Sequence, residues 1–206
     1  MELIYFKDYH ELSLAAHQWV LENISSCKEP SIFVPAGGTP KGLYKIWEQS
    51  DKAWAKGVKF FQIDEVITGS KKNLFMDFFD EHLPSFKDQI INITLDQQNR
   101  ASLGILGLGL NGHVAFHEPH MEPDFTFGEV ELTESTRKTL ELEDGARGLS
   151  YGAGAFLNTE AVLLIVSGEG KREVFQKFLN KDMDLPVSHL HKHDRLMVMA
   201  LEELKP

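Results

Sequence analysis

The sequence predicts an α/β fold, a single-domain Rossmann-like three-layer α/β/α sandwich with a mainly parallel sheet. Short apolar runs alternate along the chain with amphipathic segments of helical spacing, a pattern typical of parallel strands connected by helices. Of the 206 residues, 42% are hydrophobic, which is enough for the core of one large α/β domain. No linker or internal repeat divides the chain, so we expect one domain over residues 1–206.

The first half of the chain begins with a segment of helical spacing at residues 9–24. A short buried strand at 31–34 ends at Pro35, and Thr39 and Pro40 have the character of an N-cap and a first helical residue. That helix should continue to about residue 48. The further elements expected are a strand at 58–63, a helix at 74–83, an extended segment at 90–95 and a buried strand at 103–108.

The second half of the chain contains two less regular segments before its last strands. Residues 136–142 alternate in polarity and predict a half-exposed strand, whereas the Gly- and Ala-rich stretch 148–158 predicts a helix. The remaining elements expected are a buried strand at 161–166, a helix at 171–179 after a glycine turn, and a closing strand at 195–201.

The composition excludes several classes of function. The 21 basic and 31 acidic residues give a net charge of −10, which argues against broad binding to nucleic acid or to anionic membranes. An anionic substrate would therefore need a local set of N–H groups and a few cations. The lone Cys27 excludes an internal disulfide and is expected to be a structural or surface thiol. The apolar runs are too short to cross a bilayer and no signal peptide is evident, so we expect a cytoplasmic protein.

The most informative segment runs from Leu106 to Pro119, with the sequence Leu-Gly-Leu-Gly-Leu-Asn-Gly-His-Val-Ala-Phe-His-Glu-Pro. It follows a predicted buried strand, and its glycines loosen the strand end. Parallel α/β sheets place their functional residues just past such carboxyl ends. The loop therefore brings His113 and Glu118, five residues apart, to the expected position of an active site.

Two further loops follow predicted strands. Gly37-Gly38-Thr39-Pro40 lies between a strand and a helix, where free N–H groups favour an anion, although an ordinary tight turn fits these four residues equally well. It is not a Walker P-loop, because no Gly-Lys-Ser/Thr follows. Asp64 and Glu65 come after the next strand, so at least one carboxylate should emerge at the same sheet edge, either as a base or as a cap for the following loop.

These segments resemble, in the same order, three blocks of the glucosamine-6-phosphate isomerase (deaminase) and 6-phosphogluconolactonase family. The blocks are Val34–Pro40, Phe61–Glu65 and Gly107–Pro119, and weaker similarity continues at Val166–Lys171 and Val187–Leu190. The third block is closer to the isomerase branch, whose members carry Gly-x-Gly-x-Asp-Gly-His-Ile-Ala-Phe-Asn-Glu-Pro. Asn111 stands where that pattern has its aspartate.

The resemblance implies a cofactor-independent isomerase and deaminase that converts glucosamine 6-phosphate to fructose 6-phosphate and ammonia. Asp64 would move a proton between C2 and C1, His113 would open the sugar ring, and Glu118 would be the carboxylate partner of His113. The residues implied around the phosphate are Gly37, Gly38, Thr39 and Lys171. The partner implied is a small-molecule sugar phosphate, and self-association into a homo-oligomer is compatible with the resemblance.

Asn111 is assigned to the catalytic group by its position. An amide holds a hydrogen bond but adds no charge that would raise the basicity of His113. A carboxylate restored at position 111 is therefore expected to increase turnover.

Four alternative interpretations fit parts of the sequence. The family also includes lactonases, in which His113 would activate water, but Val114-Ala115-Phe116 and Glu118 follow the isomerase pattern. A binding protein that retains sugar-phosphate affinity without turnover is the third possibility after the two enzymes. Gly107-x-Gly109-x-x-Gly112 fits a dinucleotide fingerprint, but no long helix is predicted after it. The histidines near the motif and near the C-terminus lack an established metal-ligand spacing, so no metal is expected.

Overall fold

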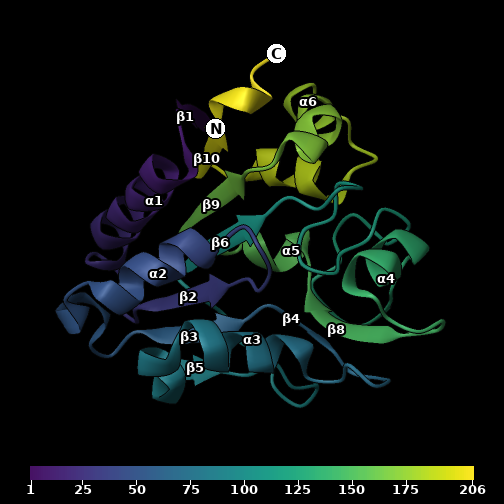
Figure 1. Cartoon of the computed structure of the whole chain (residues 1–206), viewed down its shortest axis with the longest axis horizontal. Helices are drawn as coiled ribbons and strands as arrows, with labels where there is room; N and C mark the ends of the chain where they lie inside the picture. Colours follow the sequence, from purple (N-terminus) through teal and green to yellow (C-terminus); the bar gives the residue numbers. More distant parts are fainter.

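A computed structural model describes all 206 residues and contains a seven-stranded sheet in which every neighbouring pair of strands is parallel. The strand order is β1-β10-β9-β6-β2-β3-β5 (Figure 1). The strands are β1 (Glu2–Phe6), β2 (Ser31–Val34), β3 (Lys59–Gln62), β5 (Ile90–Ile91), β6 (Leu103–Gly107), β9 (Ala161–Val166) and β10 (Leu196–Leu201). The predicted parallel α/β architecture is confirmed.

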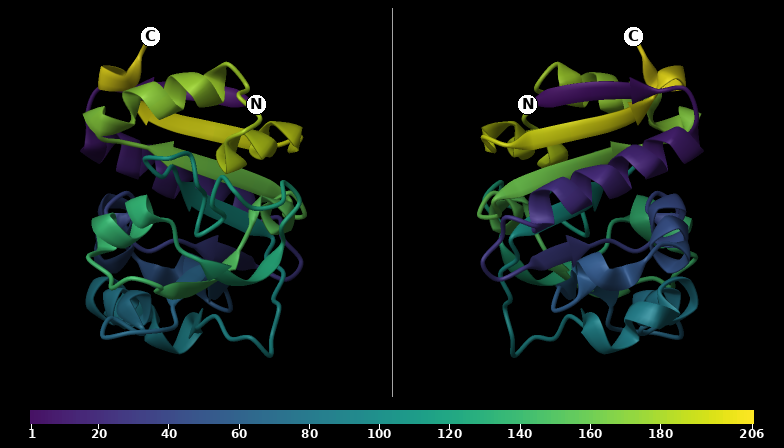
Figure 2. Two further views of the ribbon diagram at one scale, coloured as in Figure 1. Left: turned by 90° about the vertical axis from the view of Figure 1, so that its right-hand side faces the viewer. Right: turned by 90° about the vertical axis from the view of Figure 1, so that its left-hand side faces the viewer.

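Helices cover both faces of this sheet because successive strand residues point to opposite sides. Ile32 and Val34 of β2 pack in a core of 22 buried residues with the helices α1 (Tyr9–Ile24), α2 (Lys41–Gln49) and α3 (Leu74–His82). Phe33 packs on the other side, in a core of 24 buried residues with α5 (Ala153–Phe156) and α6 (Arg172–Leu179). Figure 2 shows α6 in front of the strands in one view and α1 in the other.

Short 3₁₀ helices complete the connections between the main elements. They are η1 (Lys52–Ala55), η2 (Pro84–Gln89), η3 (Glu169–Lys171), η4 (Pro186–Lys192) and η5 (Glu202–Leu204). No helix in the structure is long and apolar enough to span a membrane.

A second, antiparallel sheet of three strands lies beside the carboxyl ends of the parallel strands. Its order is β4-β8-β7, with β4 (Asp64–Val66), β7 (Phe127–Glu131) and β8 (Arg147–Tyr151). The helix α4 (Glu134–Leu140) connects β7 to β8. A separate cluster of six buried residues, which includes Phe116 and Val130, packs under this sheet.

Two predicted elements are wrong in this region. Residues 136–142 do not form a strand, because Thr133 caps α4 by accepting a hydrogen bond from the Thr136 N–H group at 3.3 Å. The stretch 148–158 is a helix only at residues 153–156. Its first part pairs with β4 and β7 as β8, and these pairings override the local Gly and Ala composition.

The start of α2 also differs from the prediction. The helix begins at Lys41, Pro40 is its N-cap residue, and Thr39 makes no capping hydrogen bond. The Thr39 hydroxyl instead accepts a hydrogen bond from the Lys171 ammonium group. The strands β1, β4 and β7 were not expected from the sequence.

Candidate functional site

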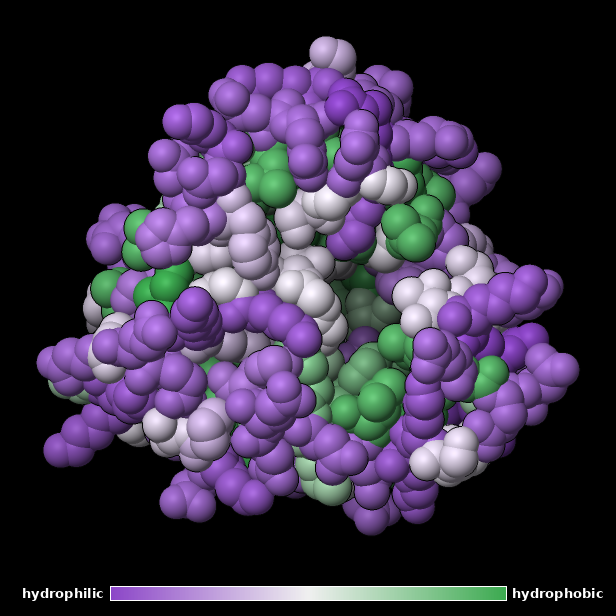
Figure 3. Space-filling model, in the orientation of Figure 1, coloured by the Kyte–Doolittle hydropathy of each residue, from purple (hydrophilic) through white to green (hydrophobic).

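A cavity of about 340 Å³ opens at the carboxyl ends of the parallel strands. From β2 the chain continues to β3 on one side of the sheet, and from β6 it continues to β9 on the other, so β2 and β6 flank the point where the strand order reverses. Open α/β sheets bind ligands at such a point. Figure 3 shows the corresponding face of the molecule hollowed between the strand ends and α4, with hydrophobic residues in the depression.

The loop after β2 forms one side of the cavity. Gly37 has φ of +95°, a conformation that residues with a side chain rarely adopt. The Tyr9 hydroxyl donates a hydrogen bond of 2.7 Å to the Thr39 carbonyl and accepts one of 2.8 Å from the Gly42 N–H group. Tyr9, which the sequence analysis missed, therefore ties this loop to the start of α2.

Lys171 is the one lysine or arginine that lines the cavity. Its ammonium nitrogen lies 3.2 Å from the Thr39 hydroxyl, and no carboxylate lies within 4.0 Å of it. Burial lowers the pKa of this ammonium group. In a chain of net charge −10, a half-buried lysine without a carboxylate partner is suited to an anionic ligand.

The two carboxylates after β3 have different surroundings. The Glu65 carboxylate accepts hydrogen bonds from Gln62 and from the N–H groups of Val66, Phe75 and Met76, at 2.7–2.9 Å. Asp64 lines the cavity, and its buried Oδ1 atom has no hydrogen-bond partner. Burial, and then the charge of Glu65, raise the pKa of Asp64 well above its usual range. Asp64 is therefore the carboxylate that reaches the cavity with an oxygen atom still unpartnered.

The loop after β6 holds His113 at the cavity. The Gly109 N–H group donates to the His113 carbonyl at 3.0 Å, and the Gly112 N–H group donates to the Gly109 carbonyl at 3.0 Å. A Cβ atom on Gly109 would lie 2.2 Å from the His113 ring, so only glycine fits beside the imidazole. Ala115, two residues after His113, has φ of +49°. This is a strained backbone conformation, and Ala115 also lines the cavity.

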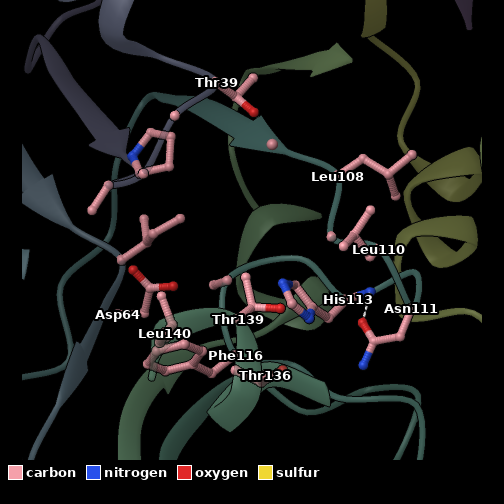
Figure 4. Close-up of a pocket in the computed structure, with 18 of the residues that line it drawn as sticks. Thr39, Asp64, Leu108, Leu110, Asn111, His113, Phe116, Thr136, Thr139 and Leu140 are labelled. Carbon is pink, nitrogen blue, oxygen red and sulfur yellow. Dashed lines mark hydrogen bonds between the residues drawn. The ribbon is translucent and has the colours of Figure 1, made fainter. Parts of the chain in front are cut away.

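Glu118 lies behind His113, away from the cavity. Its Oε2 atom is 3.7 Å from His113 Nδ1, which is within ion-pair range but too long for a hydrogen bond. Burial raises the pKa of Glu118, but the neighbouring His113 and hydrogen bonds from Thr136 and Asn111 outweigh this effect and lower it to about 2. Glu118 is thus a buried anion beside the imidazole. Figure 4 shows His113 and Asn111 on one side of the cavity and Asp64 on the other.

The other histidines do not line the cavity. His117 is buried, accepts a hydrogen bond from the Ala153 N–H group at Nδ1 and lies 3.0 Å from the Glu122 carbonyl at Nε2. Burial lowers the pKa of His117 to about 4, so it is neutral at physiological pH. No group of three or more His, Cys, Asp or Glu side chains is arranged to hold a metal ion.

The structure brings the predicted site residues together, and their roles stay predictions. Those that line the cavity are Gly37, Gly38, Thr39, Asp64, Asn111, His113 and Lys171, while Glu118 contacts His113 from behind. The sequence analysis missed the α4 residues Ser135, Thr136 and Thr139, which also line it. It missed them because it expected a strand there.

Comparisons with known proteins place this geometry in context. No family model matches the chain. Two curated relatives are glucosamine-6-phosphate deaminases. The one from Shouchella clausii is 28% identical and the one from Oceanobacillus iheyensis is 26% identical. Each alignment covers at least 97% of this chain and at least 93% of the relative.

Solved structures show the same fold. A monomeric glucosamine-6-phosphate deaminase superposes with a TM-score of 0.82 at 22% identity, over 99% of this chain and 98% of that one. The 6-phosphogluconolactonase of Leishmania guyanensis superposes with a TM-score of 0.77 at 16% identity, over 97% and 95% of the two chains. The fold is therefore the one shared by these deaminases and lactonases. In sequence, the chain is a homologue of glucosamine-6-phosphate deaminases, so the predicted resemblance is confirmed.

Proposed function

We propose that this chain converts glucosamine 6-phosphate and water to fructose 6-phosphate and ammonia. The observation that carries the proposal is that Asp64 and His113 lie on opposite sides of one cavity, which is also lined by the glycine loop after β2 and by Lys171. An aldose-ketose isomerisation needs these parts together. It requires a ring-opening acid and base, a carboxylate base shielded from water, and an anchor for the phosphate.

His113 acts first. It takes the proton of the O1 hydroxyl and returns a proton to the ring oxygen, which breaks the bond between C1 and that oxygen and leaves a C1 aldehyde. Glu118 stabilises the imidazolium formed on the way, because it stays ionised 3.7 Å from Nδ1. Asn111 holds Glu118 in this position through a hydrogen bond of 2.8 Å.

Asp64 then moves the proton between the carbons. It takes the proton from C2 while O1 of the aldehyde gains a proton, giving an enolamine. It then returns the proton to C1 while the nitrogen releases one, giving an imine at C2. Water adds to that imine and ammonia leaves, so that C2 becomes the ketone. The raised pKa of Asp64 suits this step, since a desolvated carboxylate is a stronger base than one in water.

A 6-phosphogluconolactonase is the second candidate. The fold is shared with solved lactonases, and His113 at the cavity could activate water for attack on a lactone carbonyl. Hydrolysis of a lactone needs no proton transfer at C2, however. Asp64 would then be dispensable for chemistry.

The test compares both reactions in the wild type and in Asp64→Asn. We expect release of ammonia and fructose 6-phosphate, and a loss of at least about 100-fold in kcat in the variant with substrate affinity nearly unchanged. Deuterium exchange at C2 should be lost in parallel. Asp77→Asn, on the exposed face of α3, is the matched control.

Two outcomes would overturn the proposal. Lactone hydrolysis that survives in Asp64→Asn, with no ammonia release by the wild type, would identify a lactonase. Sugar-phosphate binding without turnover of either substrate would identify a binding protein.

A further inference from the structure

Glu118 is held from two directions. Its Oε2 atom faces the loop after β6 and accepts a hydrogen bond from Asn111 Nδ2. Its Oε1 atom faces the start of α4 and accepts hydrogen bonds from the Thr133 hydroxyl at 3.2 Å and from the Thr136 hydroxyl at a shorter distance. The Thr133 N–H group adds a longer contact of 3.4 Å. The two carboxylate oxygens therefore have separate sets of donors.

The contact from Thr136 is buried, whereas those from Thr133 are part-buried. Glu118 is 0% exposed and Thr136 is 4% exposed, so the carboxylate depends mainly on protein donors. The hydroxyls of Thr133 and Thr136 lie 3.1 Å apart, on the same carboxylate oxygen. A buried carboxylate without such donors would take up a proton, because the charged form is disfavoured in an apolar environment. The titratable groups that face Glu118 are His113 and His117.

We propose that Thr133 and Thr136 are positioning residues that keep the Glu118 carboxylate ionised and directed at His113. This inference rests on the proposed function, because Glu118 matters there as the partner of the ring-opening histidine. It means that α4, which lines the cavity, is also needed to complete the catalytic group on the loop after β6. Neither threonine has to touch the substrate for this role.

The experiment compares Thr136→Val, which removes the hydroxyl at nearly constant volume, with Thr136→Ser, which keeps it. The pKa of Glu118 is followed by carbon NMR of its side-chain carboxyl group. We expect Thr136→Val to raise that pKa by about one unit or more, a tenfold change in the protonation equilibrium, and Thr136→Ser to restore the wild-type value. In the enzyme assay, a carboxylate that is no longer directed at His113 should lower kcat rather than raise KM.

Thr139→Val is the matched control for the NMR titration only, because Thr139 itself lines the cavity. It removes a hydroxyl from the same helix, but that hydroxyl bonds the Ser135 carbonyl and not Glu118. The control should leave the pKa of Glu118 unchanged. If Thr136→Val does not fold, the pair Thr133→Val and Thr133→Ser makes the same comparison.

The NMR titration needs no activity, so the two proposals can fail separately. A wild type without deaminase activity would overturn the proposed function, while the titration would still decide the role of the threonines. An unchanged Glu118 pKa in Thr136→Val, or a serine variant that behaves like valine, would overturn the positioning role.

Discussion

The Asn111 side-chain amide donates a hydrogen bond of 2.8 Å to the Glu118 carboxylate, while its oxygen accepts one of 3.3 Å from the His113 N–H group. Asn111 thus connects the backbone of the histidine to the carboxylate that faces its ring. An aspartate cannot donate this hydrogen bond when it is ionised. The choice of amide at position 111 therefore affects Glu118 more directly than it affects the imidazole.

Asn111→Asp should lower kcat and raise the pKa of Glu118. The sequence alone led us to expect higher turnover, but the geometry leads us to expect the opposite, because the new carboxylate would lie in contact with Glu118. Two carboxylates at that distance cannot both stay ionised easily, so the pKa of Glu118, followed by carbon NMR, should rise by at least about one unit. Asn111→Ala, which removes the donor without adding a charge, should give a smaller rise. Higher turnover with an unchanged Glu118 pKa would show that charge near His113 dominates.

Lys171→Met should weaken binding of the phosphorylated sugar only. A charge-assisted hydrogen bond is worth about 1.5–3 kcal/mol, so we expect KM for glucosamine 6-phosphate to rise roughly 10- to 100-fold. Calorimetry should show poor binding of unphosphorylated glucosamine to both proteins. Lys177→Met is the control, because Lys177 is an exposed residue of α6, the helix that follows Lys171, and pairs with Glu173 at 2.9 Å. Equal affinity for glucosamine and its 6-phosphate in the wild type would remove the phosphate assignment.

Asp64→Asn should make the protein more stable. The pKa of Asp64 is raised in the folded protein, so the folded state holds a proton that the unfolded state releases, and stability falls as pH rises through that range. Asp64→Asn has no carboxyl group to ionise at this position, so its stability does not fall in this way as pH rises. At pH 8 we expect a gain of about 1 kcal/mol, or ~2–4 °C in Tm, by thermal denaturation, and a smaller gain at pH 4. A gain that did not depend on pH would point to packing rather than to the carboxylate charge.

His117→Asn should flatten the dependence of stability on acid. The pKa of His117 falls from 6.5 to about 4 on folding, so between these values the unfolded state binds more protons and stability drops as pH is lowered. This difference corresponds to about 3 kcal/mol in the wild type between pH 7 and pH 4. Denaturant unfolding at several pH values should show a smaller drop in the variant. His120→Asn, at an exposed position, should behave like the wild type.

The elements that were predicted correctly are those whose residue pattern lies within the element itself. The buried strand β9 is a run of six apolar residues, and its neighbours in the sheet have the same character. The loops after these strands could then be placed at one sheet edge, which located most of the candidate site. A parallel strand buried on both faces is a nearly continuous run of apolar residues, so it can be recognised from its own sequence.

The elements that were missed depend on partners far along the chain. Strand β1 is half-exposed and pairs only with β10, at the other end of the sequence. Helix α4 contains several Ser and Thr residues of modest helix propensity, and Thr136 is buried because it bonds Glu118, 18 residues earlier. Asp64 and Glu65 are equivalent in the sequence. Only the N–H groups of Phe75 and Met76 show which of them is already satisfied.

The small cluster of buried residues under the antiparallel sheet affects how readily solvent and ligands enter the cavity. It contains six buried residues, against 24 and 22 on the two faces of the parallel sheet. A unit with so few buried contacts opens locally at a lower free energy than the whole domain unfolds. Amide hydrogens of α4 should therefore exchange with solvent long before those of β6 and β9. A sugar phosphate bound between α4 and the parallel strands would slow that exchange, which would make solvent access to the cavity observable without any chemistry.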